Sequence, residues 1–487
     1  MKESNPLETL DPENWDEMRA LAHRMVDDML DYIATSGDRP VWTPVPEAVA
    51  DKLTAAAPRN PGNPSAVYDE FLQNILPYNL HTNHPRFWAW YMGSGIVTGA
   101  LAEFLAAALN PNVGGINHVA PLVEKQVIGW ILDMVGFPGD SSGLLTSGAS
   151  MANFTALTVA RNTNCGFDLR REGVLKAPGP LTAYASTEIH SCNQKAIETL
   201  GLGTGGLRKV PVNPDFTMDI NALRQQVAAD RESGRVPFCV IATAGTINTG
   251  AIDDMNAIAD FCRDEGLWFH VDGAIGAVAV LADNVREQLS GMDRADSIAL
   301  DLHKWMHIPF EAGCVVVRDA PAHRDSFALV PEYLAREEGS GGLASGTTWF
   351  SDYGLQLTRQ FRALKVWMSV KEHGLDRFGR MIARNVEQAS YLAGLVEACS
   401  QLELMAEPGL DIVCFRYMRQ GLDTDGLNAL NREILVRLQE GGVAAPSYTT
   451  LHGRYCLRVA ISNHRSRFED FDMMIEEILR IGDAITL

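Results

Sequence analysis

The sequence lacks most features of secreted and membrane proteins. Its eight cysteines are scattered through 487 residues, with no CxxC pair and no clustered His/Cys spacing. In a chain of this length they are expected to be reduced, mostly buried thiols, as in a cytoplasmic protein without a metal site. The N-terminus has no apolar stretch of the kind found in signal peptides. The most apolar run, residues 96–109, contains Glu103 and is too short to cross a bilayer, so we expect a buried helix there.

Basic residues are in the minority. The chain has 41 Lys and Arg against 61 Asp and Glu, a formal net charge of −20. This balance argues against nucleic acid or an anionic membrane as a partner. The hydrophobic content of 46% is ordinary for a globular protein, and the length predicts two or three domains.

Apolar residues recur at helical spacing near the N-terminus, from Trp15 to Ile33, after a capping Asp11-Pro12. Such an amphipathic helix either covers a core or packs on a second subunit. A proline-rich connector follows, and then the aromatic segment 84–93, which is typical of a core strand or of a substrate-pocket wall. We expect residues 1–90 to form a helical dimerisation segment.

Between residues 121 and 317, helix and strand patterns alternate, which predicts an α/β fold with a mostly parallel central sheet. The expected strands are 143–146, 182–186, 238–243, 268–272, 297–300 and 313–317, and the expected helices include 150–161, 188–200 and 255–265. A long helix is expected at 359–372. We assign residues 91–375 to a large cofactor-binding domain and 376–487 to a small C-terminal α+β domain.

Two of the predicted strands end in polar residues that suit one cofactor. Asp272 ends the strand Trp268-Phe269-His270-Val271-Asp272, and Lys304 follows the strand at 297–300. In an open α/β sheet, ligands bind beyond the carboxyl ends of the strands. Pyridoxal phosphate needs a lysine for its Schiff base and a carboxylate that keeps its ring nitrogen protonated. We therefore expect Lys304 and Asp272 to bind pyridoxal phosphate.

Four further features lie at the same predicted edge. The turn Ser147-Gly148-Ala149-Ser150 precedes a helix, where backbone amides bind phosphate, although such turns also serve as simple connections. His190 could stack on the pyridine ring, although a lone histidine is usually structural. Thr246 follows another strand. Tyr333 lies on an irregular segment, where a phenol could deliver a proton or simply pack in a loop.

The Asp and Lys pair specifies the cofactor without specifying the reaction. A protonated ring accepts electrons released at the substrate's α-carbon, and the bond that breaks is the one perpendicular to the ring plane. Transamination, racemisation, aldol cleavage and decarboxylation all remain open on these residues alone.

The motifs in their order resemble the group II pyridoxal-phosphate-dependent amino-acid decarboxylases, nearest to the aromatic-L-amino-acid decarboxylases. The resemblance covers almost the whole chain, from Trp15 to Ile481. It rests on these segments: His303-Lys304-Trp305, His270-Val271-Asp272, Ser147-Gly148-Ala149-Ser150, Pro331-Glu332-Tyr333-Leu334, Phe361-Arg362-Ala363-Leu364-Lys365-Val366-Trp367 and Leu457-Arg458-Val459-Ala460-Ile461.

This resemblance implies fold type I of the pyridoxal enzymes (aspartate-aminotransferase-like) and a homodimer with active sites at the subunit interface. It implies that Lys304 forms the Schiff base, that Asp272 contacts the ring nitrogen, and that His190 and Ala274 lie on opposite ring faces. Ala149, Ser150 and His303 would lie at the phosphate, with Thr246 close to the cofactor. In that family a tyrosine at the position of Tyr333 protonates the carbon that loses CO2, so Tyr333 together with His190 favours plain decarboxylation to an amine.

The chain departs from the family pattern at three places. Asp301 stands where the animal aromatic decarboxylases have an asparagine near the phosphate, and a carboxylate beside a phosphate is unfavourable unless it is paired or turned away. The stretch 90–93 and the segment 112–120, which is expected to reach the partner's site, also differ.

The substrate is the least determined feature. The aromatic residues Trp88, Trp90 and Tyr91 favour an aromatic L-amino acid as the substrate. An acidic or diamino acid remains an alternative, as does oxidative decarboxylation with deamination to an aldehyde. A regulatory pyridoxal-binding protein is disfavoured, because no basic DNA-binding region is present.

Overall fold

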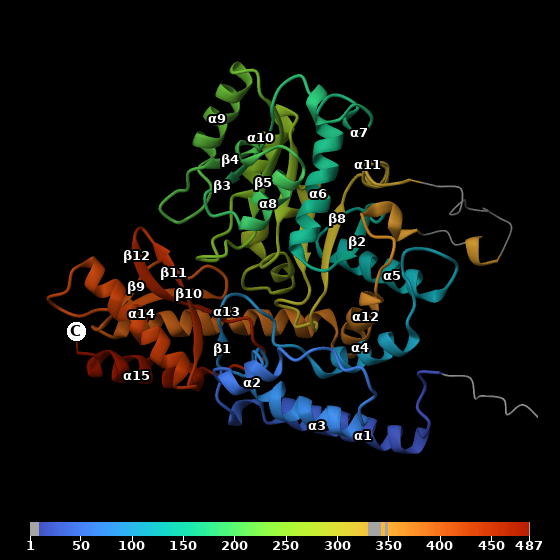
Figure 1. Ribbon diagram of the computed structural model, residues 1–487. Helices are drawn as coiled ribbons and strands as arrows, with labels where there is room; N and C mark the ends of the chain where they lie inside the picture. Colours follow the sequence, from blue (N-terminus) through green and yellow to red (C-terminus); the bar gives the residue numbers. More distant parts are fainter. Residues whose placement is uncertain (1–8, 330–341, 346–348, 487) are drawn as a thin grey trace, which may run out of the picture.

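Two β-sheets form the framework of the chain (Figure 1). The computed structural model describes residues 9–329, 342–345 and 349–486. The larger sheet has seven strands in the order β2-β8-β7-β6-β5-β3-β4. Its strands are β2 (Ser142–Thr146), β3 (Leu181–Ser186), β4 (Leu207–Val210), β5 (Val236–Thr243), β6 (Trp268–Asp272), β7 (Ser297–Asp301) and β8 (Gly313–Val317). β8 runs antiparallel to its two neighbours, β2 and β7, and the other strand pairs of this sheet are parallel, so the predicted mostly parallel sheet is confirmed.

β2, β3, β6, β7 and β8 are buried along their whole length and β5 along most of it, because helices cover them, whereas the edge strand β4 is partly exposed. α6 packs across β5, β6, β7 and β8, and α9 and α10 pack on β5. The large-domain helices are α4 (Val97–Leu109), α5 (Val119–Met134), α6 (Ala149–Asn164), α7 (Leu169–Glu172), α8 (Ser191–Thr199), α9 (Ile220–Glu232), α10 (Met255–Glu265), α11 (Ala320–Asp325) and α12 (Arg362–His373). α8 and α12 each begin three residues later than predicted.

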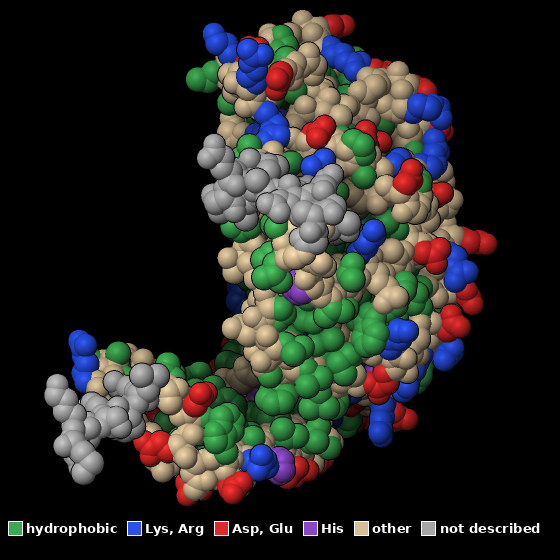
Figure 2. Space-filling view, turned by 90° about the vertical axis from the view of Figure 1, so that its right-hand side faces the viewer, with side chains coloured by type: hydrophobic (Ala, Val, Ile, Leu, Met, Phe, Trp, Pro, Cys, Tyr) green, Lys and Arg blue, Asp and Glu red, His purple; other side chains and the backbone are tan. Residues whose placement is uncertain are grey.

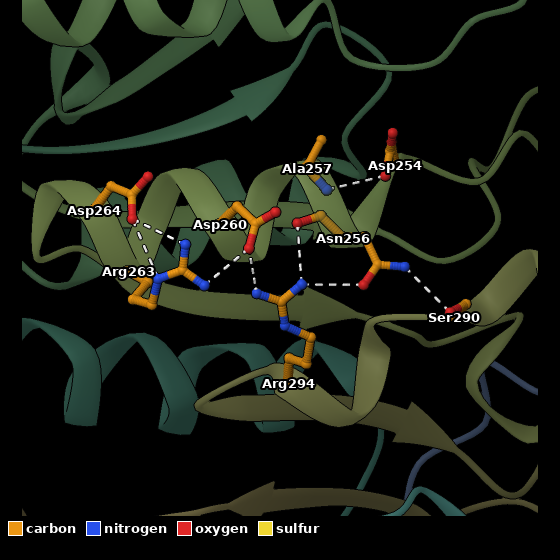
Figure 3. Close-up of polar contacts among 8 residues, drawn as sticks. All are labelled: Asp254, Asn256, Ala257, Asp260, Arg263, Asp264, Ser290 and Arg294. Carbon is orange, nitrogen blue, oxygen red and sulfur yellow. Dashed lines mark hydrogen bonds and ion pairs between the residues drawn. The ribbon is translucent and has the colours of Figure 1, made fainter.

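Helix α10 is joined to the segment that leads into β7 (Figure 3). Arg294 donates hydrogen bonds to the side chains of Asn256 and Asp260 at 3.1 and 2.6 Å. Asn256 in turn donates to Ser290 Oγ at 3.1 Å. These exposed contacts add little stability because water competes for the same groups. They link α10 to the segment that precedes β7.

The smaller sheet has the strand order β1-β11-β12-β10-β9. Its strands are β1 (Phe87–Trp88), β9 (Leu402–Leu404), β10 (Ile412–Tyr417), β11 (Ala445–Leu451) and β12 (Arg454–Ala460), and its helices are α13 (Leu375–Ala398), α14 (Thr424–Glu440) and α15 (Phe468–Ala484). α13 also contacts the large domain, where Asn385 accepts a 3.0 Å hydrogen bond from Trp305 Nε1. The same helix therefore supports both the small-domain sheet and the residue after Lys304.

The N-terminal segment forms α1 (Trp15–Ala34), α2 (Glu47–Lys52) and α3 (Pro64–Asn74), and it lies along one side of the molecule (Figure 1). α1 begins at Trp15, with Asn14 as its N-cap, and not at the predicted Asp11-Pro12. The helix begins after Asn14 because the Asn14 side chain accepts hydrogen bonds from the amides of Asp16 and Glu17. Of the residues of α1 only Leu21 is buried.

Hydrophobic side chains also remain exposed on α4 and around the start of α5, the side of the molecule that faces the viewer in Figure 2. They are Leu101, Phe104, Leu105, Leu109, Ile116, Val119 and Leu122. Among the described helices, none combines the length and the apolar character needed to span a bilayer.

Candidate active site

A cavity of about 560 Å³ opens beyond the carboxyl ends of β5, β6 and β7. It collects side chains and backbone from the turn before α6, the start of α8, and the segments that follow the three strands. The lining residues are Ser147, Gly148, Ala149, Ser150, His190, Cys192, Thr243, Gly245, Ile247, Asp272, Ala274, Ile275, Asp301, His303, Lys304, Phe310 and Glu311. The structure thus brings together Lys304, Asp272, His190, Ala274, Ala149, Ser150 and His303, which the sequence predicted from separate segments.

Lys304 lies in the connection between β7 and β8. The amides of Leu302 and His303 both donate to Ala312 O, which holds this connection closed at its base. Gly93 packs against the turn, since a Cβ there would lie 2.2 Å from the carbonyl oxygens of His303 and Lys304. The Lys304 ammonium forms a 3.0 Å ion pair with Asp301 Oδ2.

Asp272, the last residue of β6, is buried and held by two donors. Asn193 Nδ2 donates to Asp272 Oδ2 at 2.7 Å, and the Ala274 amide donates to Oδ1 at 3.3 Å. Neither donor carries a charge, so the carboxylate remains available to pair with a cationic group in the cavity. The motif search missed Asn193. Its position three residues after His190 puts it on the first turn of α8 and was the available signal.

His190 is the N-cap of α8. Its Nδ1 accepts a 3.2 Å hydrogen bond from the Cys192 amide, so a neutral ring carries its proton on Nε2. Burial lowers the pKa of His190 below its ordinary value, although the nearby Asp272 acts in the opposite direction. The ring is therefore neutral at pH 7 and can stack on a flat ligand or donate from Nε2.

The turn before α6 ends in the backbone amides expected to bind phosphate. The Ala149 amide donates to Asp301 Oδ1 at 2.7 Å. The His303 ring lies beside this turn, where its Nδ1 accepts from the Ala312 amide at 3.1 Å and Phe310 packs on it at 4.6 Å between ring centroids. Burial lowers the pKa of His303, so at pH 7 it is a neutral group near the turn.

A second hydrogen-bond network that the sequence reasoning missed lies behind the cavity. His270 contacts Ser297 Oγ through Nδ1 at 2.9 Å and Asn153 Oδ1 through Nε2 at 2.7 Å. Trp268 Nε1 donates to the same Ser297 Oγ at 2.8 Å. Burial lowers the pKa of His270 to about 4. This neutral histidine fixes β6 against β7 and α6 directly beneath Asp272.

Several predicted residues lie elsewhere. Thr246 is fully buried and turned toward its own loop, where it contacts Thr249 Oγ1 at 3.0 Å and does not line the cavity. Trp88, expected in the pocket wall, lies instead in the small-domain core, stacked on Phe471 at 4.8 Å. Trp90 is 55% exposed and Tyr91 is buried, and neither lines the cavity. Tyr333 lies outside the described residues.

Tyr91 belongs to a buried polar cluster between the two domains. Its hydroxyl donates to Asp411 Oδ2 at 2.8 Å, while Arg458 donates to Trp90 O and Ser447 Oγ. Burial raises the pKa of Asp411 from 3.8 to about 7. The aromatic segment therefore serves the domain junction, at least through Trp88 and Tyr91.

Comparison with known proteins agrees with this geometry. The family described as "Pyridoxal-dependent decarboxylase conserved domain" matches residues 46–418. The chain belongs to the pyridoxal-dependent decarboxylases. It is 32% identical to an aromatic-L-amino-acid decarboxylase of Bacillus atrophaeus, over 97% of both chains. It is 29% identical to a phenylacetaldehyde synthase of Arabidopsis thaliana, over 93% of each chain.

A solved structure of Oryza sativa TDC with PLP and tryptamine superimposes with a TM-score of 0.90 at 27% identity, covering 98% of this chain and 99% of that one. The fold predicted for the chain, that of the fold type I pyridoxal enzymes, is thereby confirmed. The enzyme is an amino-acid decarboxylase, and its cofactor is pyridoxal phosphate.

The residues of the cavity fit this cofactor. Four kinds of group face one space: a primary amine, a buried carboxylate with uncharged donors, a flat neutral imidazole and a row of helix N-terminal amides. They match the aldehyde, the ring nitrogen, the ring face and the phosphate of pyridoxal phosphate in turn.

Proposed function

We propose that the enzyme decarboxylates an aromatic L-amino acid to the corresponding amine and CO2. The observation that carries this proposal is the shared cavity of Lys304, Asp272 and His190. Apolar groups beside them, including Phe310, Ile247 and Ile275, suit an aromatic side chain better than a charged one. The names of the relatives, an aromatic-L-amino-acid decarboxylase and a structure with bound tryptamine, support the same substrate class.

Each residue of the site has a proposed task. Bound pyridoxal phosphate supplies an electron-accepting ring that takes up the electron pair left on the α-carbon when CO2 departs. Asp272 holds the ring nitrogen protonated, and Asn193 keeps that carboxylate oriented. Lys304 provides the amine that carries the cofactor until the substrate amine replaces it. His190 stacks on one face of the ring and Ala274 on the other, while Ala149, Ser150 and His303 hold the phosphate.

Two further residues complete the proposal. Thr246 would act through its neighbours Gly245 and Ile247, which line the cavity. Tyr333 would return a proton to the α-carbon after CO2 leaves, which ends the reaction at the amine. The runner-up reactions are decarboxylation of an acidic or diamino acid and oxidative conversion to an aldehyde. The similarity to a phenylacetaldehyde synthase favours the second of these.

An amino-acid panel tests the proposed function. Purified holoenzyme is given aromatic, acidic and diamino L-amino acids, and CO2, ammonia and hydrogen peroxide are measured. We expect CO2 from aromatic substrates without ammonia or peroxide. Ammonia and peroxide formed in step with CO2 would establish aldehyde formation instead, and turnover confined to acidic or diamino acids would refute the aromatic assignment.

The lysine assignment has its own test. Lys304→Ala should abolish the visible absorbance of the lysine-bound cofactor and its capture by borohydride. Lys195→Ala is the matched control, since Lys195 is an exposed lysine on α8 near the same opening. A borohydride-reducible adduct that persists in Lys304→Ala would show that another lysine carries the cofactor.

We also propose a homodimer in which the N-terminal segment and α4 pack against a second copy and place the two active sites at the interface. The exposed apolar residues on α4 support it, because surfaces of this kind on a soluble chain mark contact sites. Phe104→Glu should shift the enzyme toward monomer in sedimentation velocity, whereas Leu175→Glu, at an exposed leucine on η3 (Val174–Lys176), should not. A wild-type monomer would refute the dimer. The eight free cysteines support a cytoplasmic location.

A further inference from the structure

Asp301 stands between the two functional ends of the cavity. It is the last residue of β7 and is 3% exposed. Its Oδ1 accepts the 2.7 Å hydrogen bond from the Ala149 amide, and its Oδ2 lies 3.0 Å from Lys304 Nζ. One carboxylate therefore contacts both the amide expected to bind the cofactor's phosphate and the amine expected to carry its aldehyde.

The bond to Ala149 matters because no other side chain in the described part of the chain caps helix α6. The N-cap residue is Gly148, which has no side chain to offer. An N-terminal amide of a 16-residue helix attracts an anion, and here the anion comes from a neighbouring strand. Asp301 thus binds in the way that an incoming phosphate oxygen would.

Among the residues that the structure describes, Lys304 is the one close countercharge of this carboxylate. His303 Nε2 lies 3.7 Å from Asp301 Oδ2, but burial lowers the pKa of His303, so the imidazole is neutral at pH 7. The backbone of Gly313 also lies close to the Asp301 carboxylate, since a Cβ on Gly313 would lie 2.9 Å from Asp301 Oδ1. The carboxylate has little room to turn away while it stays hydrogen-bonded to Ala149.

We propose that Asp301 is a positioning residue that acts as an internal competitor of the cofactor's phosphate. In the cofactor-free enzyme it occupies the Ala149 amide and pairs with Lys304, and phosphate binding requires it to leave that amide. The carboxylate thereby weakens phosphate binding and keeps Lys304 in place until the cofactor arrives. This inference rests on the proposed phosphate seat at Ala149 and Ser150.

The direct test is the affinity of the cofactor-free full-length enzyme for inorganic phosphate, measured by isothermal titration calorimetry. Asp301→Asn keeps an oxygen acceptor for the Ala149 amide but removes the charge. We expect phosphate to bind on the order of tenfold or more tightly, since a like charge within a few ångströms has been removed. Pyridoxal phosphate should gain affinity similarly, and pyridoxal, which lacks the phosphate, should not.

Two further variants separate the possible results. Asp296→Asn removes a half-buried carboxylate just before the same strand. That carboxylate accepts a 2.7 Å hydrogen bond from the Phe269 amide at the sheet's opposite end, so the variant should leave phosphate affinity unchanged. Ser150→Glu adds a carboxylate to the seat itself and should abolish phosphate binding. Unchanged affinity in Asp301→Asn with loss in Ser150→Glu would overturn the role of Asp301 alone.

Phosphate binding retained in Ser150→Glu would contradict the seat, and with it the proposed function of that turn. Asp301→Ser is a second variant in case Asp301→Asn does not fold. If both failed to fold while Asp296→Asn folded normally, the carboxylate would serve the fold, and the proposal would be wrong.

Discussion

The buried ion pair between Arg359 and Glu124 offers a test of how the turn before α6 is supported. Arg359 Nη2 lies 2.5 Å from Glu124 Oε1, and both side chains are almost completely inaccessible to solvent. Arg359 also donates to Val113 O at 3.1 Å and to Leu145 O at 2.8 Å. Glu124 accepts from the Leu145 amide at 3.1 Å. The pair thus fastens the end of β2, two residues before Ser147.

Arg359→Met should lower the free energy of unfolding by about 3–5 kcal/mol, because it leaves a buried carboxylate without its countercharge. Val113 O and Leu145 O lose their side-chain donor in the same variant. Replacing both partners, Arg359→Met with Glu124→Leu, should restore much of that loss, since a well-packed apolar pair needs no desolvated charge. Urea denaturation followed by circular dichroism measures the free energy of unfolding of the wild type, Arg359→Met, Glu124→Leu and the double variant.

The control is Arg437→Met, which breaks an exposed ion pair with Glu433 on α14. Water already competes for that pair, so its loss should change stability very little. The reasoning would be refuted if Arg359→Met destabilised the protein no more than Arg437→Met. It would also fail if the double variant were as unstable as the sum of the two single variants.

Three other predictions follow from buried groups of the site and the domain junction. Burial raises the pKa of Asp411 to about 7, so the energetic penalty for its charge is absent below pH 3.8 and complete above pH 7. The stability of Asp411→Asn relative to wild type, measured by urea denaturation, should therefore increase by roughly 2–3 kcal/mol from pH 5 to pH 8. An equal stability difference at both pH values would contradict the assignment. Asn193→Leu should destabilise the cofactor-free protein by roughly 1.5–3 kcal/mol because Asp272 loses its 2.7 Å donor. Gln194→Leu, at the next residue of α8, serves as the control. Equal urea denaturation midpoints for the two variants would refute the role of Asn193. Gly93→Ala should displace the Lys304 turn and reduce the absorbance of the lysine-bound cofactor. Gly129→Ala should not, because Gly129 has open space around it. A full absorbance band in Gly93→Ala would show that the turn can shift without loss of cofactor binding.

The sequence was sufficient for the strands and for the residues at their ends. The apolar runs before Asp272 and Lys304 are buried strands, and parallel packing brings their ends to one edge. The motif residues therefore gather in one cavity even though they come from segments more than 100 residues apart. Periodicity and residue type were enough for this, because strand ends in such a sheet have a fixed relation to the ligand site.

Contacts between side chains were harder to predict. The pairing of Asn193 with Asp272 depends on how α8 is rotated over the sheet, which local sequence does not determine. The position of Trp88 was predicted incorrectly, since its aromatic character fits a pocket wall and a domain core equally well. The smaller sheet, in which Trp88 is part of β1, is otherwise built from strands more than 300 residues later in the chain. Asp301 was recognised as unusual, but only the structure shows which two groups it contacts.

The antiparallel direction of β8 in the larger sheet has a consequence for how the chain folds. β7 and β8 pair across a short connection, with Asp301 opposite Gly313, so the loop that carries Lys304 can close early at a small entropic cost. β2 reaches the other edge of β8 only when residues as far apart as Ser142 and Val317 meet, a separation of 175. We therefore expect the lysine loop to form before the helix amides are brought beside it. The two halves of the cofactor site would then be completed in order, with β2 docking as the late, slow step of folding.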